Sequence, residues 1–455
     1  MTAPLRPAPA QPRPYRFPRF ERRTLANGVG LLVASMRELP IVTVAVVTDA
    51  GAMSEPSGLD GVASLTARAL LEGTARRSAM ELTERLEHLG AAVSADADWD
   101  MAGVHVSVLR RRLDDAMALL AEIVTVPAFP EREVERLKAE RLSDILQLRA
   151  EPRGLADETF TGALYASTAR YAHPERGTAA SVERLMREDL VQFHAARYRA
   201  AGSTLIMTGD ISADEAQAIA ERTFGAWTGT AAEPPYAADS TARTARTVHL
   251  VDRPDAPQSE IRVGHVGLPR LHPEYFPVLL MNAVLGGLFS SRINLNLRER
   301  HAYTYGAHSG FDWRRGAGPF VISTAVERDV TAAAAGEILK EVEAIRAEPV
   351  SVDELELAAN YLAGVFPIRY ETTDAVARAL VAMVVYALPA DYFDSYRDRV
   401  RAVTRDDVLA AARKHLHPDA LQLVVVGAAS AVRASLDAMH FGPLIAYDKD
   451  GKHRS

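Results

Sequence analysis

Apolar and polar residues alternate with a period of two in two separate parts of the chain. The stretches VGLLVASMRELPIVTVAVVTDAG (29–51) and VHLVDRPDAPQSEIRVGHVGLP (248–269) each contain two such runs around a proline turn. Each stretch therefore predicts paired strands. Apolar residues then recur at helical spacing, which predicts a helix over 60–72 in the first case and over about 274–300 in the second.

The rest of the chain continues this repeat. After each predicted helix come two strands, then two helices of which the second begins with acidic residues, and finally a helix, a strand and a helix. In the first half these segments span 91–109, 112–127, 130–148 and 190–224, and in the second half 302–326, 329–349, 351–366 and 408–439. Two copies of one α+β module, each a mostly antiparallel sheet with helices packed on it, are the simplest interpretation.

Composition places the boundaries of these modules. A chain of 455 residues exceeds the roughly 250–300 residues of one hydrophobic core, so at least two domains are expected. Small, polar and proline residues mark an arm at the start and a linker in the middle. The predicted order is a proline-rich arm (1–19), an α+β domain (20–228), a linker (229–245), a second α+β domain (246–442) and a tail (443–455).

Charge and cysteine content exclude several classes of function. The net charge of −7 gives no basic region for nucleic acid, and the absence of cysteine excludes disulfides and cysteine-bound metals. The longest apolar stretch, 379–390, is shorter than the roughly 20 residues that span a bilayer, and the first residues lack the apolar core of a signal peptide. We therefore expect no membrane span and a cytoplasmic location, or a periplasmic one if the N-terminus has been trimmed.

Two further motifs give the chain a family resemblance. The first predicted helix lies in GLDGVASLTARALLEGT (58–74), and the second half contains LNLRERHAYTYG (295–306). With the duplicated halves, these residues resemble the pitrilysin/insulinase family of zinc peptidases, in the branch of the mitochondrial processing peptidase, over about residues 20–440. The resemblance implies that the two halves form a clam-like half chamber.

Members of that family carry His-x-x-Glu-His on the first helix, where two histidines bind zinc and the glutamate activates water. The corresponding residues here are Ser64, Ala67 and Arg68. Serine is a poor zinc ligand, alanine accepts no proton and a guanidinium repels a cation. The family's third ligand would fall near Asp144 and Ile145, and one carboxylate does not make a zinc site.

Other histidines offer no replacement in the sequence. His88 follows Glu84 and Glu87 on what is best interpreted as the solvated face of an amphipathic helix. His415 and His417 lie two residues apart near a helix end, a spacing that does not place both on one helical face. We therefore expect no metal and no other cofactor in this chain.

Arg298 and Tyr305, in contrast, match the family's arginine and tyrosine, which in active relatives bind substrate carbonyls and the oxyanion from the opposite half. Both side chains suit that role: a phenol donates a hydrogen bond that strengthens as negative charge develops, and a guanidinium holds peptide oxygens in a fixed geometry. Taken singly, Tyr305 is better explained as a half-buried strand aromatic and Arg298 as a surface helix residue. Their joint position within the motif favours the functional interpretation.

Two weaker signals complete the candidate site. Gly286 and Gly287 interrupt a helical pattern, which indicates a bend or a close approach of the backbone. The resemblance assigns the segment 91–109 to the sheet edge on which relatives bind substrate as an added strand. An ordinary amphipathic strand is an equal alternative.

A lost zinc motif beside a retained Arg298 and Tyr305 predicts a non-catalytic subunit of a heterodimeric zinc peptidase. A homologous partner would bring the zinc, and this chain would close the chamber around a peptide or unfolded polypeptide. Two alternatives remain open: an inert assembly protein, like the respiratory core proteins that share this architecture, and a homodimeric peptide-binding module.

Overall fold

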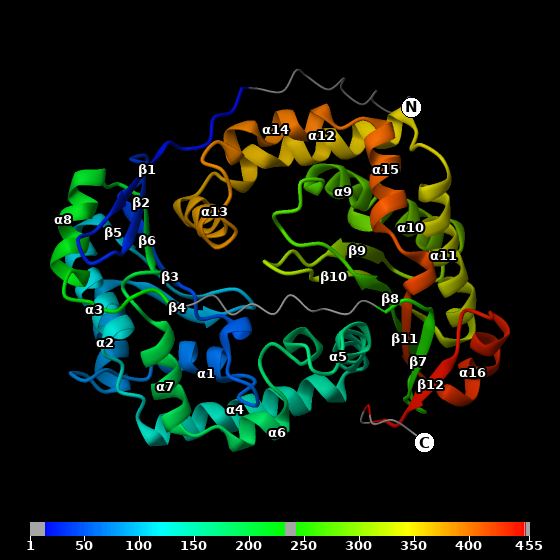
Figure 1. Cartoon of the computed structure of the whole chain (residues 1–455), viewed down its shortest axis with the longest axis horizontal. Coiled ribbons are helices and arrows are strands. Elements are labelled where there is room, and N and C mark those ends of the chain that lie inside the picture. Colours follow the sequence, from blue (N-terminus) through cyan, green and yellow to red (C-terminus); the bar gives the residue numbers. More distant parts are fainter. Residues whose placement is uncertain (1–13, 233–242, 450, 452–455) are drawn as a thin grey trace, which may run out of the picture.

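The computed structural model describes residues 14–232, 243–449 and 451, and within them the chain forms two six-stranded sheets covered by helices (Figure 1). The first half contains these strands: β1 (Phe20–Thr24), β2 (Gly30–Ser35), β3 (Ile41–Thr48), β4 (Ala92–Ala97), β5 (Ala102–Leu109) and β6 (Thr204–Gly209). Its helices are α1 (Val62–Ala69), α2 (Ala79–Leu89), α3 (Leu113–Thr125), α4 (Glu131–Ala150), α5 (Pro152–Leu164), α6 (Ala179–Arg184), α7 (Arg187–Arg197) and α8 (Ala213–Phe224).

The second half repeats this plan. Its strands are β7 (Thr247–Asp252), β8 (Gln258–Val266), β9 (Ala307–Phe311), β10 (Pro319–Glu327), β11 (Gln422–Gly427) and β12 (Leu444–Tyr447). Its helices are α9 (Tyr275–Asn282), α10 (Arg292–Asn294), α11 (Thr331–Ala347), α12 (Val352–Arg369), α13 (Thr373–Val385), α14 (Tyr392–Ala402), α15 (Arg405–His415) and α16 (Ala429–Ala438). Two π-helical turns, Ala283–Gly287 and Leu295–Arg300, follow α9 and α10.

The order of the strands confirms the internal repeat. The sheets run β1-β2-β6-β3-β5-β4 and β12-β7-β11-β8-β10-β9, so five strands of one sheet correspond to five of the other. Among the described residues, four of the five pairings in the first sheet and three of the five in the second are antiparallel. The predicted α+β fold with two homologous halves is therefore confirmed.

The pairing of the opening strands was predicted wrongly. β6 lies between β2 and β3, and β11 lies between β7 and β8. Both inserted strands come from the end of their half and are almost entirely buried, because helices cover both faces of the sheet at its centre. A strand buried on both faces is more stable in the middle of a sheet than at its edge. The inserted strands therefore separate β2 from β3 and β7 from β8, which do not form hairpins.

The outermost strands distinguish the two halves. β1 from the start of the chain borders the first sheet, whereas β12 from the end of the chain borders the second, parallel to β7. Residues 444–447 lie within the segment predicted as a tail, but they form a sheet strand with half-buried side chains instead. At the opposite edges lie β4 and β9, so the segment 91–109 does provide a sheet edge, as predicted.

Each half also covers the sheet of the other half. Helix α5 packs on β8 and β11, and helix α13 packs on β3 and β6 (Figure 1). Polar contacts fix this exchange: the Thr208 hydroxyl donates to the Thr373 carbonyl at 2.8 Å, and Arg262 pairs with Asp157 at 2.5 Å. The two cores are interlocked, although a linker separates the halves in sequence.

The described end of the N-terminal arm is packed against the second half. Phe17 is 5% exposed and stacks on Phe393 with ring centroids 4.4 Å apart, and Tyr15 meets Phe366 edge-on. These aromatic contacts anchor residues that had been assigned to an extended arm. The remainder of the predicted arm, 1–13, and residues 233–242 of the predicted linker lie outside the described residues.

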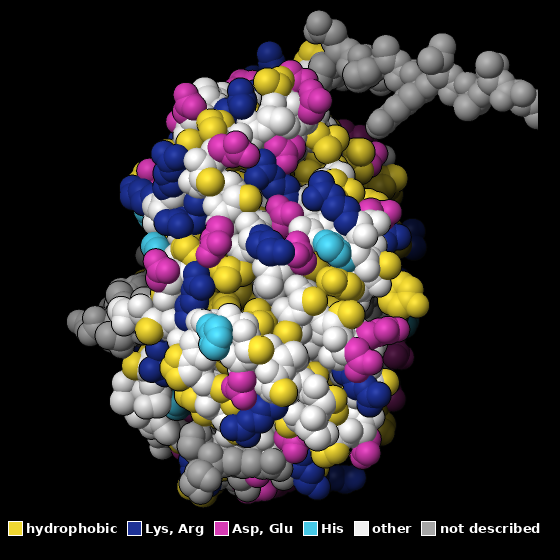
Figure 2. Space-filling model, turned by 90° about the vertical axis from the view of Figure 1, so that its right-hand side faces the viewer, with side chains coloured by type: hydrophobic (Ala, Val, Ile, Leu, Met, Phe, Trp, Pro, Cys, Tyr) yellow, Lys and Arg dark blue, Asp and Glu magenta, His cyan; other side chains and the backbone are white. Residues whose placement is uncertain are grey.

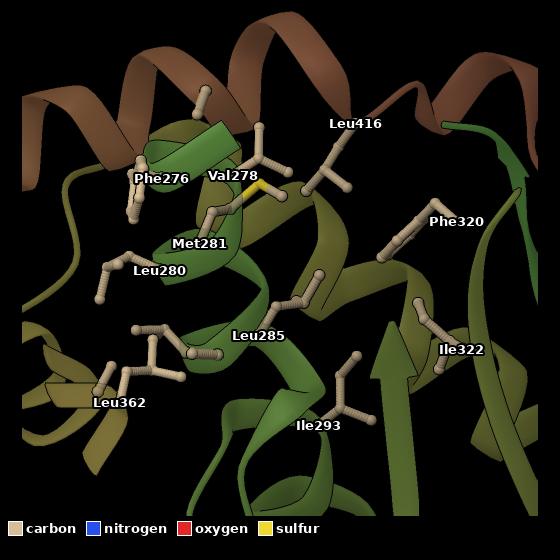
Figure 3. Packing of buried hydrophobic residues seen from close by; sticks show 14 of the residues in the cluster. Phe276, Val278, Leu280, Met281, Leu285, Ile293, Phe320, Ile322, Leu362 and Leu416 are labelled. Atoms are coloured by element: carbon tan, nitrogen blue, oxygen red, sulfur yellow. The ribbon is translucent and has the colours of Figure 1, made fainter. Parts of the chain in front are cut away.

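One segment, 275–300, is long and apolar enough to span a membrane by length and composition, but 56% of its apolar window is buried inside the protein. It contributes Phe276, Met281 and Leu285 to the core of the second half, opposite strand β10 (Figure 3). The helix is also interrupted at Leu288, where the backbone is extended. These features are those of a core helix of a folded domain.

The outer face of the second half shows acidic and basic side chains interspersed over its surface (Figure 2). A continuous basic patch, which binding to a nucleic acid backbone requires, is not visible on that face.

Candidate functional site

Helix α1 is fixed at its N-terminus by a buried carboxylate. Glu55 accepts hydrogen bonds from the backbone N–H groups of Gly61 and Ala63, both at 3.0 Å, and pairs with Arg170 at 2.6 Å. Gly61 has φ +98°, and a Cβ atom there would lie 2.7 Å from the Arg176 carbonyl oxygen. Only glycine fits at position 61. Gly61 and the buried Glu55 together fix the start of α1.

Serine, alanine and arginine occupy the three zinc-motif positions on α1. Ser64 and Ala67 are buried, and Arg68 reaches out to Glu140 at 2.9 Å. The guanidinium of Arg141, from α4, points to the same place: its Nη2 lies 3.4 Å from the Ser64 hydroxyl and its Nη1 3.7 Å from Asp144. Arg141 was not identified from the sequence, where one arginine among many on α4 gives no signal.

These residues do not fit a zinc ion. The buried guanidinium of Arg141 lies beside Ser64, at the position of the first histidine ligand. Arg68 occupies the position of the second histidine. Burial lowers the pKa of Arg141 from its ordinary value, and the nearby Arg176 and Arg68 lower it further; an arginine nevertheless stays charged in a protein. The positive charges of Arg141 and Arg68 would therefore repel a divalent cation.

A cavity of about 390 Å³ lies next to this cluster, between α4, α5 and the loop 174–178. Arginine and carboxylate side chains alternate along its wall, including Arg141, Asp144, Glu158 and Glu175. Burial raises the pKa of Glu175 above its ordinary value. The zinc position of the fold has thus become a network of paired charges.

In the second half, the glycines that interrupt the helix are closely packed, Gly286 against strand β9 and Gly287 against the end of α9. A Cβ atom at Gly286 would lie 2.4 Å from the Ser309 hydroxyl, and one at Gly287 would lie 2.8 Å from the Asn282 amide. The predicted close approach of the backbone is therefore confirmed. It turns the chain out of α9 toward α10.

The segment that carries Arg298 is anchored on its inner side. Ile293 and Leu297 are fully buried, and Asn296 donates to Glu337 at 3.1 Å and to Glu341 at 2.7 Å. These contacts hold the π-helical turn against α11 and leave its other side to carry Arg298.

A partly buried ion pair ties the same segment to α12. Arg292 donates to both oxygens of Glu354, at 2.6 and 2.9 Å. These hydrogen bonds, together with the backbone N–H of Ser351, lower the pKa of Glu354 from 4.5 to about 2. Glu354 also caps α12 in a capping box with Ser351, so one carboxylate fixes two elements.

Tyr305 lies at the rim of a cavity of about 560 Å³ that both halves line. Its side chain is 94% exposed, and within the described part of the chain its hydroxyl forms no hydrogen bond. Arg298 does not line this cavity; its guanidinium lies 4.6 Å from the ring centre of Phe289 and 3.6 Å from Glu299. Phe289, which is 70% exposed, lines the cavity together with Tyr305.

Phe289 is a residue of this site that the sequence did not reveal, since one aromatic after two glycines has no special spacing. Its ring orients the Arg298 guanidinium through a cation–π contact. The cavity also contains Arg153 of α5 and Arg262 of β8, which meet there through the exchange of helices. Arg153 is exposed, whereas Arg262 is buried and paired with Asp157 and Glu260.

The two parts of the site differ in kind. The α1 region is buried and internally paired, whereas the Tyr305 region is exposed. β4, the free sheet edge, packs beside α1 and alternates exposed and half-buried side chains along most of its length. Glu84, Glu87 and His88 are all exposed on α2, which confirms them as a solvated helix face.

Together, two interlocked α+β halves and a first helix at the zinc position define a protein with the fold of two-half zinc peptidases. The family model described as "Insulinase (Peptidase family M16)" matches residues 32–180. The family model described as "Peptidase M16 inactive domain" matches residues 184–362. The chain belongs to this M16 peptidase family.

Known relatives and structures agree with this assignment. The chain is 25% identical to an uncharacterized zinc protease of Rickettsia bellii over 75% of this chain and 82% of that one. It is 28% identical to a probable mitochondrial-processing peptidase subunit beta of Schizosaccharomyces pombe over 59% of each chain. A non-peptidase homologue of Helicobacter pylori is 22% identical over 83% of this chain and 86% of that one. The structure of a peptidase M16 inactive domain from Pseudomonas fluorescens superposes with a TM-score of 0.83 and 28% identity, over 90% of this chain and 98% of that one.

Proposed function

We propose that this chain is the non-catalytic subunit of a heterodimeric zinc peptidase, and that its partner is a homologous chain with an intact His-x-x-Glu-His helix. One observation carries the proposal: the zinc position holds Ser64 with the Arg141 guanidinium at 3.4 Å, while Tyr305 is exposed and its hydroxyl has no hydrogen-bond partner among the described residues. A chain with these two features lacks the ion but retains donors that a second chain can use.

The exposure of Tyr305 supports a role across an interface. A phenol that is 94% exposed on a single chain can approach a substrate that lies on another chain. Neighbouring exposed aromatics such as Phe289 suit the centre of an interface, where buried aromatic anchors contribute most of the binding energy.

The donors suit the chemistry of peptide hydrolysis. The partner's zinc would polarise the scissile carbonyl and supply the attacking water. Tyr305 would donate its O–H to the substrate oxygen as negative charge develops, and Arg298, oriented by Phe289, would hold a neighbouring peptide carbonyl. The peptide itself would add to a free sheet edge, for which main-chain hydrogen bonds suffice.

The names of the relatives support separate roles for related chains. One relative is named a zinc protease, one a subunit of a processing peptidase and one a non-peptidase homologue. A division between an ion-bearing chain and a supporting chain is consistent with all three.

The test uses co-expression with a homologous chain from the same organism that carries His-x-x-Glu-His. We expect hydrolysis of an unfolded polypeptide by the complex, little or none by either chain alone, and loss of activity when a chelator removes zinc. Hydrolysis by the isolated chain would contradict the proposal. A stable complex whose activity equals that of the partner alone would favour the assembly role instead.

A further inference from the structure

A group of three metal-binding side chains lies in the second half, apart from α1 and Tyr305. His272, Glu274 and His415 each offer a ligand atom, and these atoms lie within 4.8 Å of one another. His272 and Glu274 precede α9, and His415 ends α15, 141 residues further along the chain. Such a separation gives no signal in the sequence.

The contacts between the three side chains hold them together without a metal. His415, which is 5% exposed, places its Nε2 2.5 Å from Glu274 Oε2, and its ring meets the His272 ring edge-on at 5.0 Å. The Nδ1 of His272 accepts only a long hydrogen bond of 3.2 Å from the Glu274 backbone N–H. The helices α9 and α15 pack against each other, which brings the start of α9 close to the end of α15.

The nearby His265 is excluded as a ligand by its own contacts. His265 is fully buried and uses both ring nitrogens, one toward the Val266 carbonyl at 2.8 Å and the other as acceptor from the His417 N–H at 3.2 Å. The three-residue group is therefore distinct from the His265 and His417 pair.

We propose that His272, Glu274 and His415 bind one divalent transition metal ion of the zinc type, with water in the fourth position. Two imidazoles and one carboxylate form a ligand set that zinc prefers, whereas magnesium and calcium prefer oxygen ligands alone. Ligand atoms around tetrahedral zinc lie about 3.3 Å apart, given metal–ligand distances of about 2.0–2.2 Å. Small rotations of the half-buried His272 and Glu274 side chains close the site.

One cation competes with the metal. Lys414 Nζ lies 2.8 Å from Glu274 Oε2, but its side chain is 61% exposed and its long stem allows it to turn into solvent. The ion would then join the start of α9 to the end of α15. Since α9 leads into the segment that carries Arg298, the ion would stabilise the half that holds the exposed donors.

The test is zinc binding by the full chain alone, after treatment with EDTA. We expect calorimetry to show one equivalent of zinc, no comparable binding of magnesium, and a melting temperature that rises by a few degrees at about a hundredfold excess over Kd. His272→Asn leaves the bond between His415 and Glu274 in place, so its melting temperature in EDTA should match the parent. Its zinc affinity should fall at least about tenfold, the lower limit of the loss seen on removing even an indirect metal partner.

One control variant and one further test variant complete the experiment. His301→Asn removes a histidine 3.8 Å from Glu337, a comparable pair in the same half, and should leave zinc binding unchanged. Lys414→Met removes the competing cation and should strengthen binding. Absence of saturable zinc binding, equal binding by His272→Asn, or no gain from Lys414→Met would each overturn the proposal. None of these measurements requires a partner chain, so their outcome is independent of the proposed subunit role.

Discussion

Restoring the zinc motif on α1 tests how far the charge network around Arg141 opposes a metal. The variant Ser64→His, Ala67→Glu, Arg68→His and Ile145→Glu rebuilds the family's ligands, while Arg141 keeps its place 3.4 Å from position 64. A guanidinium about 5 Å from a divalent ion, at an effective dielectric of about 20, costs roughly 7 kcal/mol. That corresponds to about a 10⁵-fold loss in affinity.

The structure therefore predicts that the fourfold variant binds no additional zinc at micromolar concentration. With Arg141→Ala added, one more equivalent than in the parent should bind, because the helix and its Glu55 cap are retained. Metal analysis after dialysis measures the stoichiometry, and circular dichroism checks the fold. One extra equivalent of zinc in the variant that keeps Arg141 would refute the electrostatic reasoning.

Three further predictions concern stability, measured by urea unfolding. Glu354→Gln should cost about 2 kcal/mol at neutral pH, after a discount for partial exposure. The folded pKa of about 2 lies below the ordinary 4.5, so this contribution is present above pH 4.5 and is lost as the pH falls toward 2; an equal deficit at low pH would contradict it. Gly286→Ala should cost about 2 kcal/mol or more because the new methyl group would lie 2.4 Å from a hydroxyl of β9, whereas Gly364→Ala, in open space on α12, should be neutral or stabilising. Phe17→Ala should cost about 3 kcal/mol, and a loss below 1 kcal/mol would show that the arm is not anchored.

The sequence predicts local elements well and long-range pairing poorly. Helices over 112–127, 130–148, 329–349 and 351–366 appear as α3, α4, α11 and α12, because helical periodicity is a local property. The insertion of β6 between β2 and β3 depends on contacts between strands more than 150 residues apart, as the pairing of Thr43 with Thr208 illustrates. No local pattern specifies such a neighbour.

In the candidate site, too, local motifs could be predicted from the sequence and long-range contacts could not. The motif positions Ser64, Ala67 and Arg68 could be located from their flanking residues, and so could Arg298 and Tyr305. Their surroundings could not be predicted: Arg141 and the partners of His415 come from distant elements that only the fold brings together. Phe289 is close to Arg298 in sequence, but a single aromatic residue after two glycines has no special spacing. The exchange of α5 and α13 between the sheets has the same origin, because either sheet would accept an amphipathic helix of that size.

The most direct test of the proposed subunit role is the turnover of the assembled peptidase with Tyr305→Phe in this chain. Tyr305 is 94% exposed, so the change should alter the stability of the isolated chain by less than about 0.5 kcal/mol. Loss of one donor to the developing oxyanion should lower kcat by about 10²- to 10³-fold while KM changes little. A complex that keeps its full kcat with Tyr305→Phe would show that this chain does not contribute to the chemistry.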